Sequence, residues 1–165
     1  MAVVNTKSNG ITNADATPMV RSARALVGAP LLSMVATLAV AAGDDDTSVY
    51  RFCRLPSNAV IMKIDLLNDA ITAGTVYDVG LYQTAANGGA VASVNCFAND
   101  VDLSSARVDP LDVLHQALDI NKAEKRLWEV LALPVDSGRE YDLCLTGATV
   151  GTAAGDITVK VYYTV

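Results

Sequence analysis

The chain has few of the side chains that carry enzyme chemistry. Its 165 residues include one histidine, His115, and three cysteines, Cys53, Cys96 and Cys144, which form no CxxC pair. A zinc site needs several such ligands at close spacing, and a cysteine nucleophile needs a histidine to activate it. We therefore expect three small, buried, reduced cysteines in strands, in a protein that folds in a cytoplasmic compartment. His115 lies among apolar residues and is predicted to be packed or interfacial.

Other motifs of catalysis are missing as well. No GxSxG occurs, and the glycine-rich stretch "AANGGA" at residues 85–90 lacks the lysine and the strand-to-helix context of a phosphate-binding loop. The acidic run Asp44–Asp46 has the chemistry to hold a hard cation such as Ca²⁺, but a solvated acidic turn is the preferred interpretation. We expect no catalytic residue, no cofactor, no metal and no small-molecule substrate, and hence no enzyme.

Charge is scarce and unevenly placed. Charged residues make up 18% of the chain and hydrophobic residues 52%, which favours a protein with part of its surface against other proteins. Residues 1–43 hold three basic side chains and one acidic side chain, about +2, whereas residues 44–165 hold nine and seventeen, or −8. The acidic body repels phosphate and the front is sparse in lysine and arginine, so nucleic acid is not expected as a partner.

One uncharged run imitates a signal peptide or a short membrane span. It is "ALVGAPLLSMVATLAVAA", residues 25–42. Gly28 and Pro30 interrupt it, and Ala, Ser and Thr dilute its apolar character. We interpret residues 31–42 as a buried strand behind an irregular arm and expect no membrane association, with a secreted β protein kept as an alternative.

Residues 1–30 form the predicted arm. They are rich in Asn, Thr, Ser, Ala and Gly without steady periodicity, yet carry more apolar residues than a solvated linker needs. Ordering such a segment costs about 1–2 kcal/mol per residue, so we expect it to order only along another surface. The side chains expected to make that contact are Lys7, Ile11, Met19, Val20, Arg21, Arg24 and Leu26.

The rest of the chain, residues 31–165, is dominated by the two-residue period of β-strands. Turn signals separate the predicted strands, which span residues 31–42, 47–55, 59–67, 75–83, 90–98, 140–146 and 156–165. The last two are expected to form a hairpin. Val60, Met62, Ile64 and Leu66 are predicted to share one face of their strand, as are Tyr77, Val79 and Leu81 of the next and Ile157, Val159, Val161, Tyr163 and Val165 of the last.

A helix is expected near residues 121–132. Asn121 and Glu124 match a capping box, and Trp128 is expected to pack on the sheets. Residues 107–120 fit either a helix start at Asp109-Pro110 or a strand through His115. The whole pattern predicts a mainly β fold: an antiparallel β-sandwich, most naturally a jelly roll, with one short helix and an extended N-terminal arm.

Three stretches carry a resemblance to a known family. They are "YRFCRLPSNAVIMKIDLLNDAITAGTVYDVGLYQT", "GGAVASVNCFANDVDLSSA" and "KRLWEVLALPVDSGREYDLCLTGATVGTAAGDITVKVYY", together spanning roughly residues 47–165. With the "RLPSNA" strand, the "DLSSA" loop and the "KRLWE…EYDL" close, they resemble capsid decoration (cement) proteins of tailed bacteriophages.

The resemblance implies a jelly-roll sandwich on the outer surface of the virion head, made in the host cytoplasm. Its implied partners are the major capsid protein and neighbouring copies of itself, as a dimer or trimer. The rival hypothesis is a receptor- or carbohydrate-binding sandwich of a virion fibre. Such modules display aromatic side chains or a cation on their loops, whereas the six tyrosines here fall mostly in predicted strands.

Overall fold

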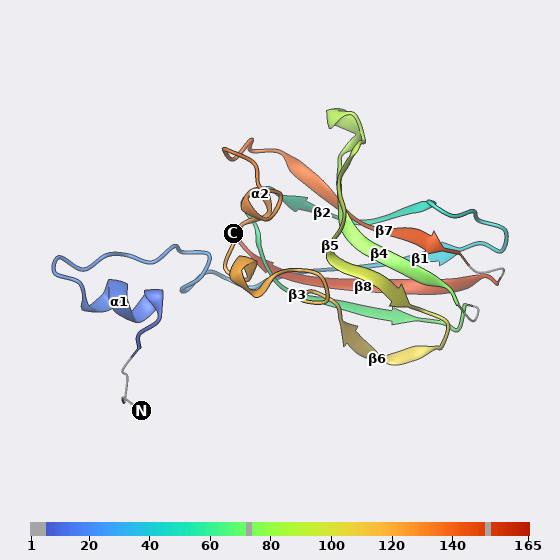
Figure 1. The fold of residues 1–165 in the computed structure, drawn as a ribbon, viewed down its shortest axis with the longest axis horizontal. Coiled ribbons are helices and arrows are strands. Elements are labelled where there is room, and N and C mark those ends of the chain that lie inside the picture. Colours follow the sequence, from blue (N-terminus) through green and yellow to red (C-terminus); the bar gives the residue numbers. More distant parts are fainter. Residues whose placement is uncertain (1–5, 72–73, 151–152) are drawn as a thin grey trace, which may run out of the picture.

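The alternating apolar residues pack between two antiparallel four-stranded sheets (Figure 1). The computed structural model describes residues 6–71, 74–150 and 153–165. One sheet has the order β1-β8-β3-β6 and the other β2-β7-β4-β5. The strands are β1 (Leu32–Val40), β2 (Val49–Pro56), β3 (Val60–Asn68), β4 (Val76–Gln83), β5 (Val91–Asp102), β6 (Arg107–Asp112), β7 (Glu140–Thr149) and β8 (Gly155–Thr164).

The strand pairing is nested from the ends of the body inward. β1 pairs with β8, β2 with β7, β3 with β6 and β4 with β5, all antiparallel. Such a chain is a long hairpin rolled over itself, and eight strands divided in this way between two sheets form a jelly roll. The predicted fold class, a mainly β antiparallel sandwich with jelly-roll topology, is confirmed.

The core lies between the sheets and draws on every strand pair. Tyr77, Val79 and Leu81 of β4 have no exposed surface, as their alternation predicted. Ile157, Val159, Val161 and Tyr163 of β8 are buried too, but Val165 lies beyond the strand and is 42% exposed, so its predicted place on that face is wrong. Burial of this many aliphatic side chains supplies the main driving force for folding the body.

The predicted hairpin between the last two strands is wrong. β7 and β8 belong to different sheets, and β8 lies between β1 and β3. The connection that includes Ala148 and Val150 crosses from one sheet to the other, in the way that β1 and β2 are also connected. Period-2 patterning marks which residues face the core, but it is the same for a hairpin and for a crossing between sheets.

The predicted helix at residues 121–132 is reduced to two short pieces. Asp119 caps the 3₁₀ turn η2 (Ile120–Lys122), and the helix α2 spans Leu127–Val130. The backbone N–H groups of Leu127 and Trp128 donate to the carbonyl oxygens of Ala59 and Ser57. The predicted capping box is wrong because these tertiary hydrogen bonds start the helix later, where Glu129 Oε2 accepts from Arg126 N at 3.0 Å.

Two predicted strand faces need correction. A bulge between Ile61 and Lys63 places Ile61 in the core and leaves Met62 40% exposed, so Met62 does not share the face of Ile64. β1 is also less buried than expected: it lies at a sheet edge, and Val35 is 63% exposed. In the ambiguous segment, residues 107–112 form β6, and the turns after it expose His115, which is interfacial only if another chain covers it.

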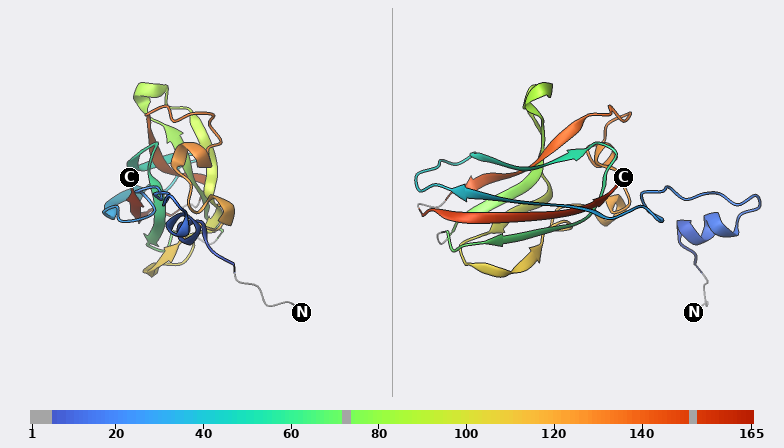
Figure 2. Two further views of the ribbon diagram at one scale, coloured as in Figure 1. Left: turned by 90° about the vertical axis from the view of Figure 1, so that its left-hand side faces the viewer. Right: turned by 180° about the vertical axis from the view of Figure 1, so that it is seen from behind.

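The N-terminal arm extends beyond one end of the sandwich (Figures 1 and 2). It is less irregular than predicted, because Asn9–Asp15 form the helix α1 with Ser8 as N-cap. The first five residues of the predicted arm lie outside the described residues. Within the described ranges, no helix is long and apolar enough to cross a membrane.

Gly80 gives a direct test of the sandwich packing. The β5 backbone runs so close to it that a Cβ at this position would lie 2.2 Å from the carbonyl oxygens of Ser93 and Val94. We expect Gly80→Ala to lower the free energy of unfolding by roughly 3 kcal/mol in urea titrations. Gly10→Ala is the matched control, since its Cβ would have no neighbour within 3.8 Å. Equal midpoints for both variants would contradict this packing.

Candidate functional site

The root of the arm is fixed to the last strand of the body. Ala25 is 3% exposed, and the Thr164 hydroxyl donates to its carbonyl oxygen at 2.6 Å. Residues 23–27 turn at this point through hydrogen bonds from Leu26 N and Val27 N to Ala23 O. The arm therefore leaves the sandwich from a defined position beside the C-terminus, as Figure 1 shows.

The seven predicted contact residues are all exposed in this chain. Ile11, Met19 and Val20 are 53%, 64% and 52% exposed, and Leu26 is 39% exposed. Exposed residues also include Lys7, Arg21 and Arg24. Of the seven, Leu26 alone lines a groove against the body, and the structure does not gather the others into one site.

The helix α1 has little to stabilise it within its own chain. It has seven residues and buries none of them. Its described stabilising contacts include the Ser8 cap and an exposed ion pair between Lys7 Nζ and Asp15 at 2.7 Å. Isolated helices of this length are marginal in water, and exposed ion pairs contribute little. The arm thus presents apolar side chains on a scaffold that gains stability when something covers it.

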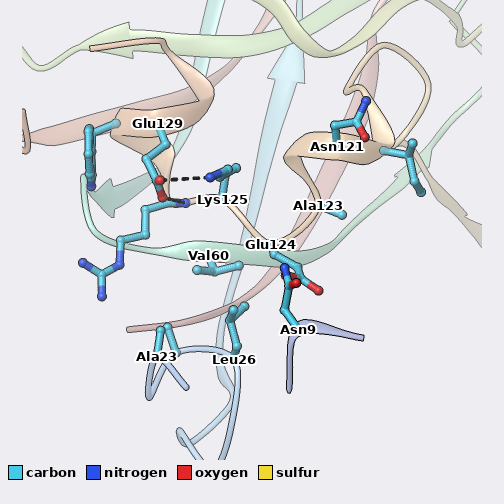
Figure 3. A pocket seen from close by; sticks show the side chains of 13 residues that line it. Asn9, Ala23, Leu26, Val60, Asn121, Ala123, Glu124, Lys125 and Glu129 are labelled. Atoms are coloured by element: carbon cyan, nitrogen blue, oxygen red, sulfur yellow. Dashed lines mark hydrogen bonds and ion pairs between the residues drawn. The ribbon is translucent and has the colours of Figure 1, made fainter. Parts of the chain in front are cut away.

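A groove of about 690 Å³ separates the arm from the body. Figure 3 shows Leu26 and Asn9 on the arm side and Glu124, Lys125 and Glu129 on the body side. Lys125 and Glu129 form an ion pair at 3.4 Å. Trp128 also lines the groove, half-buried, and its indole Nε1 is buried without a hydrogen-bond partner.

Sequence reasoning placed the contact site on the arm and did not include the body side of this groove. The available signal was Trp128, the one tryptophan of the chain, beside the charged run at residues 124–126. Because these residues fitted a helix packed on the sheets, the pattern gave no reason to place them opposite the arm.

The cysteines have the environment of structural side chains. Cys53 and Cys144 are buried, Cys96 is half-buried, and all three are free thiols in strands. Burial raises the pKa of the Cys96 and Cys144 thiols to about 12. Thiols with such pKa values are almost entirely protonated at neutral pH, so they are poor nucleophiles.

The acidic turn at Asp44–Asp46 is used by the backbone. Asp44 accepts from the Tyr50 hydroxyl at 2.7 Å and from Ala41 N, and Asp46 accepts from Val150 N. These hydrogen bonds brace the β1–β2 connection. In the part of the chain that the structure describes, no group of three or more histidine, cysteine or acidic side chains is placed to hold a metal.

Aromatic side chains form no binding platform. Tyr77, Tyr82, Phe97, Tyr141 and Tyr163 are buried. Tyr50, Phe52, Trp128 and Tyr162 are half-buried, which completes the nine aromatic residues of the chain. A carbohydrate or a base stacks on an exposed ring, and no ring here is exposed enough to offer its face.

The fold and the exposed arm together define a jelly-roll sandwich with an N-terminal extension. Two solved structures contain chains similar to it. A chain of the capsid of Ralstonia phage GP4 has a TM-score of 0.57 and 14% identity, with 82% of this chain and 84% of that chain covered. A chain of the cyanophage Pam1 capsid asymmetric unit has a TM-score of 0.53 and 12% identity, with 83% and 86% covered. No family model and no curated protein matches the sequence.

The Asp44–Tyr50 hydrogen bond predicts a pH dependence. The hydrogen bonds from Tyr50 and Ala41 lower the pKa of Asp44. Its contribution to stability is therefore present above the unfolded-state pKa of about 3.9 and is lost as the pH falls through the lower folded-state value. We expect Tyr50→Phe to lower the melting temperature at pH 6 and to differ less from the wild type near pH 2.5. Tyr162→Phe is the control, and a difference independent of pH would contradict the assignment.

The Thr164–Ala25 hydrogen bond predicts how firmly the arm is rooted. Thr164→Val leaves the Ala25 carbonyl unpaired, at a cost of roughly 1–2 kcal/mol, or about a fivefold to thirtyfold rise in the released form. Trypsin should then cleave the Arg24–Ala25 bond faster by that factor, as measured by mass spectrometry. Cleavage after Arg21, which lies outside the anchor, is the internal control. Equal acceleration at both bonds, or at neither, would contradict the anchor.

Proposed function

We propose that this chain is a decoration (cement) protein that binds the outer surface of a tailed-phage head and stabilises its shell. In this proposal the sandwich, residues 31–165, caps the lattice. The arm, residues 1–30, extends onto the major capsid protein or a neighbouring decoration copy. The protein is made in the host cytoplasm and resides on the virion.

The exposed arm is the observation that carries the proposal. Ile11, Met19 and Val20 expose more than half of their surface, although the body nearby has a well-filled core. Fully burying one such side chain is worth about 1.5–3 kcal/mol, which offsets the cost of ordering one or two residues. A neighbouring subunit that covers these side chains gains this free energy, and the arm becomes ordered as it binds.

The charge distribution supports a protein partner. The front of the chain is about +2 and the body is −8. Exposed Arg21 and Arg24 lie next to the apolar Met19 and Val20, a combination that fits an acidic protein surface with apolar patches. The acidic body disfavours an interaction with the packaged nucleic acid, which agrees with a place outside the shell.

The two similar structures support the same role. Both similar chains are parts of phage capsid assemblies. Each alignment covers nearly equal shares of the two chains it compares, so those chains have about the length of this one. At 12–14% identity the similarity concerns the fold, and the role is our inference from fold, size and arm together.

The rival hypothesis, a receptor- or carbohydrate-binding module, has less support. No aromatic side chain is exposed enough to stack on a sugar ring, and no cation site occurs within the described residues. The arm has no purpose in that hypothesis, whereas a cement protein uses it directly.

Binding to undecorated heads tests the proposal. We expect deletion of residues 1–24, which keeps the Ala25 anchor, to reduce occupancy on the heads at least tenfold and to abolish the added heat resistance of the particles. The double variant Met19→Ser, Val20→Ser should weaken binding in the same direction. Val135→Ser changes an equally exposed apolar residue of the body, 67% exposed, and is the control.

Unchanged occupancy and unchanged heat resistance after the deletion would overturn the proposal. Urea titrations of each variant check that the sandwich itself is intact, so that a loss of binding is assigned to the arm.

A further inference from the structure

Three of the four sheet edges carry features that block pairing with another chain. β2 carries Arg51, Arg54 and Pro56. β6 carries Pro110 with charged residues on both sides, and β5 has three irregularities of register and ends in Asp100 and Asp102. Charges, prolines and bulges are the means by which natural sheets keep their edges from associating.

The fourth edge, β1, has none of these features. It is nine residues long, contains no charge, proline or glycine, and follows β8 in one continuous register. It is the one strand of the eight without a charged side chain. Among the described residues, no strand pairs with its other side. A long, uncharged and regular edge strand is a template for another strand.

Exposed apolar side chains surround this edge. Leu31, Leu32 and Val35 are 61%, 40% and 63% exposed, and Val49 at the start of β2 is 38% exposed. Figure 2, in the view from behind, shows β1 and β2 together on the near side of the sandwich. The polar and acidic residues of the body lie elsewhere, so this side lacks the charge that keeps acidic bodies apart.

We propose that the free edge of β1 pairs antiparallel with β1 of a second copy across a two-fold axis. The two sheets β1-β8-β3-β6 then join into one sheet of eight strands. A second copy fits because an uncharged strand meets itself without like-charge repulsion, whereas the −8 bodies repel over any other contact.

The geometry of the pair restricts its register. Residues directly opposite each other in an antiparallel pair point to the same side of the sheet. The half-buried Met34, Ala36 and Leu38 face the core, so they must meet their counterparts, and exposed Val35 must meet outward residues such as Val35 or Thr37. Every allowed register therefore has one residue facing its own copy near the middle of the strand.

The pairing has a consequence that rests on the proposed function. β1 follows directly on the arm, and antiparallel strands point in opposite directions, so the two arms leave the joined sheet from opposite ends. A dimer of this form grips two places on a shell, and binding of one arm raises the effective concentration of the other.

Sedimentation velocity of the full chain, without phage heads, tests the pairing over about 1–100 μM protein, the range in which a micromolar Kd is measured. We expect the wild type to dimerise. Val35→Lys should weaken the dimer at least tenfold, about 1.4 kcal/mol, because two ammonium groups meet near the axis. Val108→Lys is the matched control: Val108 is 85% exposed on β6, the opposite edge of the same sheet.

Hydrogen exchange supplies a second readout. The β1 amides should be protected more strongly as the wild-type concentration rises, and Val35→Lys should abolish this dependence. A wild type that stays monomeric throughout the range, or equal weakening by both lysine variants, would overturn the pairing. A monomer that still decorates heads would overturn the pairing alone, whereas a dimer that fails to bind heads would overturn the proposed function alone.

Discussion

The structure depends on the pairing of its last strand with two distant ones. β8 lies between β1 and β3, so that Leu32 faces Tyr163 and Val60 faces Thr164. These pairs close the sheet across most of the chain, and such long-range closure is entropically costly until the side chains of both sheets pack. The sheet is therefore incomplete until the final residues are present. The same closure brings Thr164 to Ala25 and so fixes the point from which the arm leaves.

The molecule divides its apolar residues between two uses. In the body they fill a core in which Leu55, Ile64 and Leu143 have no exposed surface. In the arm and along β1 they remain exposed, at Met19, Val20 and Val35 above all. A free monomer gains nothing from this second set. An assembled protein gains a large part of its binding free energy from it, because the area is covered only when a neighbour is present.

The sequence predicted most of what depends on local pattern. The alternation of Tyr77, Val79 and Leu81 placed β4 and its buried face correctly, and the arm was recognised from composition. The errors came from tertiary effects. The Ser57 and Ala59 carbonyls moved the start of the helix to Leu127, and a crossing between sheets replaced the predicted β7–β8 hairpin.

The candidate site was predictable in part for the same reason. Exposed apolar residues in the arm follow from its composition, so Ile11, Met19 and Val20 were identified from sequence. The free edge of β1 was not, because whether a strand lies at an edge depends on sheet order, which the two-residue period does not encode. The groove beside Trp128 depends on how the arm turns at Ala25. Both features belong to the fold and are absent from any single segment.

The central claim is that the arm acts by covering its apolar residues with a neighbouring subunit. Cryo-electron microscopy of virions that contain this protein tests it most directly. The account predicts jelly-roll density repeated over the outer surface of the head, with residues 6–30 laid along an adjacent subunit and Met19 and Val20 covered. Density for the sandwich confined to a tail or fibre, or a sandwich on the shell whose arm touches no neighbour, would contradict it.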